Sequence, residues 1–326
     1  MTDVTKPLMT AVLLGLYELV TANSSNPSSH TTHSGGVAAI LCAEGSPFDL
    51  SIRGNLFQLA HALRSGRHFE VVPNSPAPAP TPSFNPTDIS AVAFHQVLRR
   101  AEDCLSRSVA LAEDLRDVLH QAVLLDKRLA LWPTRQSDEW RPRTIQAGSQ
   151  HPPEGLNFWP PRVDTYYDLY VAAAWNAHRK NRLMLLDKIL RLSERLQLKD
   201  GVRKLQAEAA DLVAAIMASI PYHVTHDLDM QQHLSSSSPG EVSPGKSIGG
   251  LLLMHPLYIS SNLSIVPLHL RCQMRECLAW IGQNMGIGQA TVFSNTLTVF
   301  PDESVIHGYV LLWASMAFGP EGHIGA

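Results

Sequence analysis

Apolar residues recur at helical spacing along much of this chain. Near its beginning they stand at positions 13, 14, 16, 17 and 20, which predicts a helix that stops in the polar run 21–29. Further along, a longer stripe alternates steps of four and three residues and predicts a helix that ends at Pro133. The members of this stripe are Leu111, Leu115, Val118, Ala122, Leu125 and Leu129.

The same rhythm continues through the middle of the chain. A helix is expected to begin near Val163 and Asp164, with Asp164 as its N-cap, and to run to Leu196. Gly201 should interrupt the pattern. A second stripe over residues 205–220 predicts another helix, which we expect Pro221 to end because proline lacks the amide proton.

Further apolar patterns complete the helical prediction. Pro267 should open a helix that carries apolar residues as far as Met285, where Gly286 suits the C-cap. A last apolar helix is expected over residues 305–317, and a shorter one over 57–63, after the apolar segment 38–42. No stretch shows sustained alternation of period two. The pattern therefore predicts an all-α, multi-helix fold.

Three segments without this pattern are expected to be flexible loops. Residues 73–86 contain six prolines, residues 136–161 are irregular, and residues 227–250 contain four consecutive serines and several glycines. We expect these loops to lie within a single domain that covers residues 1–326.

Composition places the chain among packed proteins. Hydrophobic residues make up 45% of it and charged residues 17%, and the net charge is −3. This balance does not supply the basic field that phosphate backbones select, so it argues against nucleic-acid binding. The apolar run 8–20 is too short to span a bilayer, and Asp3 does not suit the basic start of a signal peptide. We expect no membrane association.

The four cysteines, Cys42, Cys104, Cys272 and Cys277, contain no CxxC pair. They are interpreted as ordinary thiols, and no metal site is expected.

His223, His226 and His233 form the most plausible metal-ligating group, with His223 and His226 spaced as HxxH. Pro221 should prevent a regular helix there, and no neighbouring glutamate completes a metalloprotease pattern. The favoured interpretation is therefore a helix end with a buried Tyr222 and a hydrogen-bonded His223.

The pair Trp175–Asn176 is a second candidate, because asparagine is a poor helix former. It predicts a buried polar contact, with a ligand contact as the alternative. The nearby Arg179, Lys180 and Arg182 are interpreted as a solvated face.

No catalytic residue can be named from the sequence. The GxG at residues 286–288 has no third glycine and no preceding strand, so it predicts a helix cap and a tight turn rather than a phosphate site. Fifteen histidines are scattered without a Ser/Cys–His–Asp arrangement. We expect a protein that is not an enzyme and that has no cofactor, and no cofactor-binding residue can be named.

Four segments, taken in order, carry a family resemblance. They are AVLLGLYELVT at residues 11–21, YYDLYVAAAWNAHRKNRLMLLDKILRLSERL at 166–196, ASIPYHV at 218–224, and GGLLLMHPLYISS at 249–261 followed by LAWIGQNMGIGQA at 278–290. This set resembles the regulatory domain of fungal zinc-cluster transcription factors.

The resemblance implies an all-helical domain with roles in ligand response, activation control and self-association. In such factors a six-cysteine DNA-binding module lies upstream, and the resemblance begins almost at Met1. We therefore expect a nuclear regulator of transcription, with the cytoplasm as the alternative location. It would act through partner proteins, such as a zinc-cluster factor or a second copy, and would not bind specific DNA sequences directly. A small-molecule effector and control of secondary metabolism are further expectations from the resemblance.

Three alternatives stay open. The gene model could be truncated, with an upstream exon that encodes the zinc cluster. The domain could have been co-opted to bind or convert a small molecule, or it could be a helical interaction scaffold without a ligand.

Overall fold

The structure is a computed structural model, and it describes residues 5–25, 32–33, 36, 91–146, 152–225 and 247–297. The predicted apolar segment 38–42, the predicted helices 57–63 and 305–317, the proline-rich segment 73–86 and most of the loop 227–250 lie outside the described residues.

Helices account for most of the described part, which confirms the all-α prediction. They are α1 (Thr5–Thr21), α4 (Ala91–Ser106), α5 (Ala112–Ala130), α6 (Leu169–Arg195), α7 (Val202–Val224), α9 (Ser247–Ser261), α10 (Leu268–Asn284) and α11 (Gly288–Asn295). Two short 3-10 turns, η2 (Pro133–Arg135) and η3 (Asp138–Trp140), follow α5.

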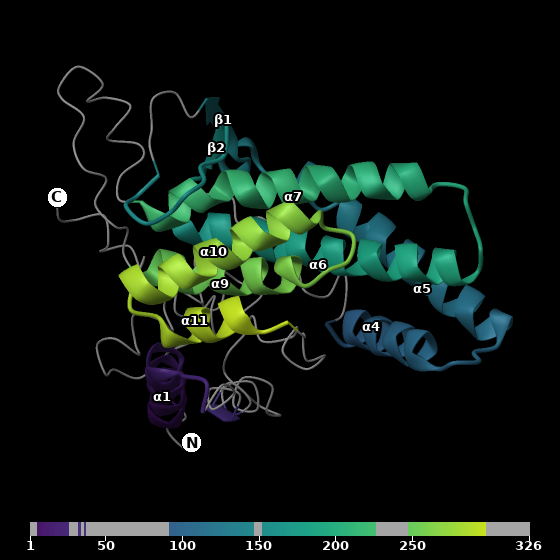
Figure 1. Cartoon of the computed structure of the whole chain (residues 1–326), viewed down its shortest axis with the longest axis horizontal. Helices are drawn as coiled ribbons and strands as arrows, with labels where there is room; N and C mark the ends of the chain where they lie inside the picture. The colour runs from purple at the N-terminus through teal and green to yellow at the C-terminus, as the bar shows by residue number, and fades with distance from the viewer. Residues whose placement is uncertain are drawn as a thin grey trace, which may run out of the picture.

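The long helices α6 and α7 lie side by side and form the centre of the molecule (Figure 1). Helices α4 and α5 cover one side of α6, and α9 covers another side while it also contacts α7. Helix α10 packs on α9 and α11, and α11 in turn contacts α1 at the edge of the molecule (Figure 1). Helix α6 is thus enclosed by neighbours on several sides.

This enclosure explains the burial pattern of α6. Every residue from 171 to 180 is buried, and so are residues 183–187. The core therefore includes polar side chains of α6 together with leucines such as Leu183, Leu185 and Leu186. A helix packed on one face only would have exposed those polar residues.

The prediction for residues 136–165 was wrong in two respects. Strand β1 (Arg143–Gln146) lies in the segment expected to be irregular, and it pairs antiparallel with β2 (Arg162–Thr165). Residues 163–164 are therefore strand, and Asp164 is not a helix N-cap. Its carboxylate Oδ1 instead accepts a hydrogen bond from Thr144 Oγ1 at 2.7 Å.

The N-cap of α6 is Asp168, whose Oδ1 accepts a hydrogen bond from the Val171 amide at 2.7 Å. This contact satisfies one of the free amides at the start of the helix, as an N-cap should. Helix α6 thus begins four residues later than the sequence pattern predicts from Asp164.

Proline 221 does not end α7, contrary to the prediction. The helix continues to Val224, and the Thr225 amide donates to the Pro221 carbonyl at 3.1 Å. A proline removes one amide donor, but in the last turn the carbonyl side of the helix ladder remains available. The segment ASIPYHV is therefore helical.

Two glycine predictions are confirmed. Gly201 has φ = 81° at the N-cap of α7, and Gly286 has φ = 71° directly after the C-cap of α10. Pro267, expected to open α10, is its N-cap residue. Helices α4, α9 and α11 were not predicted from the pattern, and the first four residues of α9, 247–250, were assigned to a loop. Within the described ranges, no helix is both long and apolar enough to cross a membrane.

Candidate functional site

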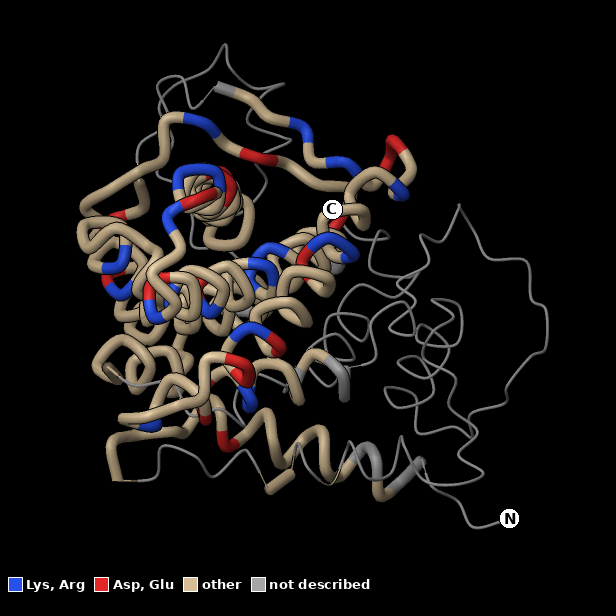
Figure 2. Tube along the Cα trace, turned by 90° about the vertical axis from the view of Figure 1, so that its right-hand side faces the viewer, with Lys and Arg blue, Asp and Glu red and all other residues tan. Residues whose placement is uncertain are grey.

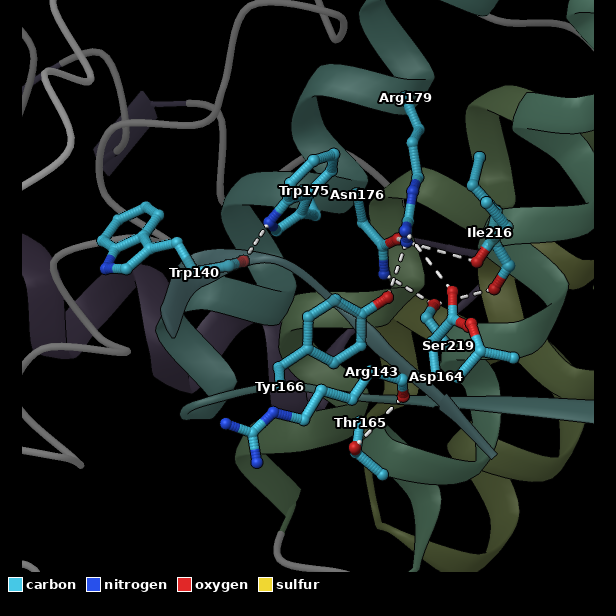
Figure 3. Close-up of polar contacts among 12 residues, drawn as sticks. Trp140, Arg143, Asp164, Thr165, Tyr166, Trp175, Asn176, Arg179, Ile216 and Ser219 are labelled. Atoms are coloured by element: carbon cyan, nitrogen blue, oxygen red, sulfur yellow. Dashed lines mark hydrogen bonds and ion pairs between the residues drawn. The ribbon is translucent and has the colours of Figure 1, made fainter. Parts of the chain in front are cut away.

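A cluster of polar side chains lies buried between α6, α7 and strand β2 (Figure 3). Asn176 and Arg179 come from α6, Ser219 and His223 from α7, and Asp164 from β2. Tyr166, directly after β2, completes the cluster, which we call the Arg179 cluster. Asn176 and Ser219 are fully buried, and Arg179 is 4% exposed.

Helical spacing brings these residues together. Asn176 and Arg179 stand three residues apart and therefore share one side of α6, while Ser219 and His223 stand four apart on α7. The Asn176 Nδ2 group donates to Ser219 Oγ at 2.8 Å and lies 3.2 Å from His223 Nε2. Ser219 Oγ donates in turn to the Ile216 carbonyl at 2.7 Å. The prediction of a buried polar contact at Asn176 is thus confirmed.

The guanidinium of Arg179 is the charged centre of the cluster (Figure 3). It donates to Tyr166 Oη at 2.6 Å and to Asn176 Oδ1 at 3.0 Å, and its Nη2 lies 3.5 Å from Asp164 Oδ2. It also lies 5.5 Å from the ring centre of Trp175, within the range of a cation–π interaction. A buried charge with these partners is compensated in place and does not need a ligand.

Burial sets the protonation of the cluster. It lowers the pKa of His223 to about 3, and the nearby Arg179 charge acts in the same direction, so the ring is neutral near pH 7. Burial also raises the pKa of the Tyr166 phenol, which stays protonated. The interpretation of His223 as a hydrogen-bonded histidine is confirmed. Tyr222 was expected to be buried but is only half-buried, and its hydroxyl donates to the Tyr166 carbonyl at 3.0 Å.

An aromatic group borders the Arg179 cluster. The His178 ring stacks on Trp132 with centroids 4.7 Å apart, and Trp132 meets Trp175 edge-on at 4.9 Å. The Trp175 indole nitrogen donates to the Trp140 carbonyl at 2.7 Å, as Figure 3 shows. Burial lowers the pKa of His178 to about 3, helped by the charges of Arg182 and Arg179.

The interpretation of Arg179, Lys180 and Arg182 as a solvated face was wrong. Lys180 is fully buried, which lowers its pKa well below the usual value. Arg182 donates to Asp126 on α5 at 2.9 Å and to Glu208 on α7 at 2.8 Å. Arg182 thus connects α6 to α5 and α7, and Lys180 is buried because α6 has neighbours where a surface helix would have water.

Two further cations of α6 also lie beside a carboxylate, whereas the exposed Arg195 donates to the Arg107 and Ser108 carbonyls. Lys188 bonds to Glu102 of α4, and Arg191 lies 3.8 Å from the same carboxylate. Figure 2 shows Lys and Arg positions interspersed with Asp and Glu positions over the described part of the chain. A duplex-binding face would concentrate the basic residues instead.

The geometry offers little for catalysis. The Ser219 hydroxyl donates to a backbone carbonyl of its own helix, so no histidine withdraws its proton. Among the described residues, no group of three His, Cys, Asp or Glu side chains could hold a metal ion. His226 and His233 lie outside the described residues, so only His223 of the proposed metal group is placed.

Sequence reasoning found Asn176, Tyr222 and His223 but missed Asp164 and Tyr166 as their partners. The available signal was the pair of β-branched residues Val163 and Thr165, which favour a strand at the point where a helix start was expected.

The comparisons with known proteins relate this chain to a fungal transcription factor. No family model matches the chain, and no solved structure matches it. The chain is 36% identical over 314 residues to transcription factor dbaG of Emericella nidulans, and the match covers 95% of this chain and 74% of that protein. A relationship over nearly the whole chain at this identity places the two proteins together, and the chain belongs to the family of fungal transcription factors that includes transcription factor dbaG.

Proposed function

We propose that this chain is a regulatory domain of the zinc-cluster type, which controls transcription through partner proteins and does not read DNA sequence itself. The observation that carries the proposal is the 36% identity to a named fungal transcription factor over 95% of the chain. The resemblance of four segments to the zinc-cluster regulatory domain supports the finer assignment.

The disposition of charge supports the absence of direct DNA readout. The densest basic stretch of the described part is α6, and four of its cations, Arg179, Arg182, Lys188 and Arg191, lie beside Asp164, Asp126, Glu208 or Glu102. Lys180 is buried, and the exposed Arg195 donates to the Arg107 and Ser108 carbonyls. Phosphate contacts require Lys and Arg side chains that can exchange counterions for DNA, and paired side chains are poorly suited to this.

The cysteines support the same proposal. A binuclear zinc cluster needs six closely spaced thiolates, and the chain contains four cysteines. Cys104 and Cys277 are buried, and burial raises the pKa of the Cys277 thiol, which disfavours the thiolate that binds zinc. Neither residue is suited to a cluster.

The proposed setting is the nucleus, with the cytoplasm as the alternative, and the proposed partners are a zinc-cluster factor or a second copy of this chain. Control of a secondary-metabolite gene cluster and response to a small-molecule effector are part of the same proposal, and they rest on the resemblance alone.

A tethering experiment tests the proposal. The chain is fused to an unrelated DNA-binding domain in a fungal host, and transcription of a reporter with the matching operator is measured. We expect reporter output to change when the chain is tethered, and to stay at background when the same chain is expressed without the fused domain. Equal output in both arms would contradict the proposal.

A second candidate is that these residues are the regulatory part of a longer factor with its own zinc cluster. The observation that favours it is that the match covers only 74% of the relative, so that protein has sequence outside the match. Sequencing of the 5′ end of the transcript distinguishes the candidates, because an in-frame upstream segment with six cysteines would establish the longer factor.

A further inference from the structure

Strand β1 is the outer strand of the small sheet. It pairs antiparallel with β2 from Arg143 opposite Thr165 to Gln146 opposite Arg162, and β2 in turn packs on α7. Figure 1 shows the two strands at the edge of the molecule, with β2 on the side of the helices. Because the described sheet consists of these two strands, the other edge of β1 has no strand beside it among the described residues.

The exposure of the two strands matches this arrangement. Val163, Asp164 and Thr165 of β2 are buried, whereas Arg143 and Thr144 of β1 are exposed. Hydrogen-bonding groups alternate in direction along a strand, so every second residue of β1 directs its amide and carbonyl away from β2. An edge of this kind is a template for pairing with a further strand. We call this outer side of β1 the β1 edge.

The β1 edge is positively charged. The two strands contain two cations, Arg143 and Arg162, and both side chains are exposed. The one carboxylate of the strands, Asp164, is buried and lies 3.5 Å from Arg179 Nη2, so it compensates an interior charge instead. Figure 3 shows the Arg143 guanidinium pointing away from Asp164. The sign of this local charge is opposite to the net charge of the chain, which is −3.

The charges that precede β1 balance one another. Arg141 pairs with Asp138 at 2.9 Å, and Arg135 and Glu139 are of opposite sign. The surplus positive charge therefore belongs to the two ends of the paired strands. A strand added at the β1 edge would lie about 5 Å from β1 and about 10 Å from β2, close enough for exposed charges to interact at physiological salt.

This charge selects among the possible occupants of the edge. Two copies of the chain joined at β1 would bring together four arginines, two from each copy, in one small sheet, and like charges on paired strands are destabilising. An extended segment that carries carboxylates would gain charge-assisted contacts with Arg143 in addition to backbone hydrogen bonds. An acidic segment is therefore the occupant that fits.

We propose that the β1 edge binds an extended acidic segment of a partner protein, which adds as a third strand. Its carboxylates would stand at alternate positions on the face that carries Arg143 and Ile145, because side chains alternate along a strand. The proposal rests on the proposed action through partner proteins for its biological role, and it adds the chemistry of the partner. A failure of this binding would leave the result of the tethering experiment unchanged.

Fluorescence anisotropy of the full chain with a labelled peptide tests this binding. The peptide alternates Glu and Thr over about eight residues, so that it exceeds the four residues of β1. We expect saturable binding, which Arg143→Glu should weaken about tenfold or more through the loss of a charge-assisted contact. Arg99→Glu is the matched control, because Arg99 is an exposed arginine on α4, and this variant should bind like the wild type. A peptide that alternates Lys and Thr should not bind.

Methylation of the peptide backbone separates strand addition from simple charge attraction. An added strand pairs through one of its two edges, and alternate residues direct their amides to each edge. Of two peptides that are N-methylated at all Glu or at all Thr residues, one should lose binding about tenfold or more, and the other should keep it.

The proposal is overturned if Arg143→Glu binds like the wild type, or if the two methylated peptides bind equally well. Hydrogen exchange of β1 before the peptide is added gives a further check. Protection of every β1 amide in the free chain would overturn the proposal, because the edge would already be paired within the chain or with a second copy.

Discussion

Arg179 illustrates how this protein holds a charge in its interior. Its guanidinium has three neutral hydrogen-bond acceptors and one carboxylate, supplied by β2, α6, α7 and the residue after β2. The distribution of partners over several elements means that the side chain connects them as well as being compensated by them. Removing it would leave Asp164 buried without its cation.

This leads to a comparison of two arginine truncations. Arg179→Ala should lower the free energy of unfolding by about 3–5 kcal/mol, because it strands a buried carboxylate. Arg100→Ala breaks an Arg–Asp pair at 2.8 Å whose side chains are 45% and 52% exposed, and it should cost about 0–1 kcal/mol. Urea unfolding of the two variants and the wild type measures both values. Equal losses would show that the Arg179 cluster contributes no more than a surface pair.

The buried histidines predict a dependence of stability on pH. The pKa values of His178 and His223 are lowered from 6.5 to about 3, so the unfolded chain binds protons at a pH where the folded chain does not. The stability that these two neutral histidines contribute is therefore present above pH 6.5 and is lost as the pH falls below it. Between pH 7.5 and 5.5 each histidine should remove about 1.4 kcal/mol.

His178→Phe isolates one of these contributions, because phenylalanine keeps a ring against Trp132 but cannot take up a proton. The difference in unfolding free energy between pH 7.5 and 5.5 should be about 1.4 kcal/mol smaller in this variant than in the wild type. The account of His178 fails if the two proteins show the same difference.

At the scale of elements, the main helical stripes were predictable and the connections were not. The four-three rhythm located α5, α6 and α7, because each buries a continuous apolar stripe. Pro221 misled the prediction because a proline rule for helix interiors was applied to a last turn. The strand pair was missed because four residues are too few to show alternation.

The Arg179 cluster was only half predictable for a related reason. The poor helix propensity of Asn176 indicates that it is buried. The sequence around Arg179 and Lys180, in contrast, is the same whether the helix is buried or lies on the surface. Their burial depends on α4, α5, α7 and α9 surrounding α6, and this arrangement is not encoded in local spacing.

Gly249 provides a test of how α7 and α9 pack. A Cβ at this position would lie 2.0 Å from the His223 carbonyl oxygen, so the two helices must separate to accept one. Gly249→Ala should therefore lower the unfolding free energy by about 1–3 kcal/mol, despite the better helix propensity of alanine. Gly36→Ala meets nothing within 4 Å and serves as the control. Thermal unfolding in which Gly249→Ala is as stable as the wild type would contradict this packing.

At the scale of the whole molecule, many charged side chains pair with one another between neighbouring elements. Four cations of α6, Arg179, Arg182, Lys188 and Arg191, lie beside carboxylates from α4, α5, α7 and β2, and the net charge of the chain is −3. The structure thus uses its basic residues to hold helices together. This use of the basic residues supports the proposal that the chain acts through partner proteins.

The most direct test of this account is a fluorescence anisotropy titration of the purified chain with promoter fragments at about 150 mM salt. We expect weak binding without sequence preference, in the range of about 10⁻⁴–10⁻⁶ M that is typical of non-specific association. Nanomolar binding to one fragment that scrambled competitor DNA does not displace would contradict the account, because it would require a DNA-reading surface in this chain.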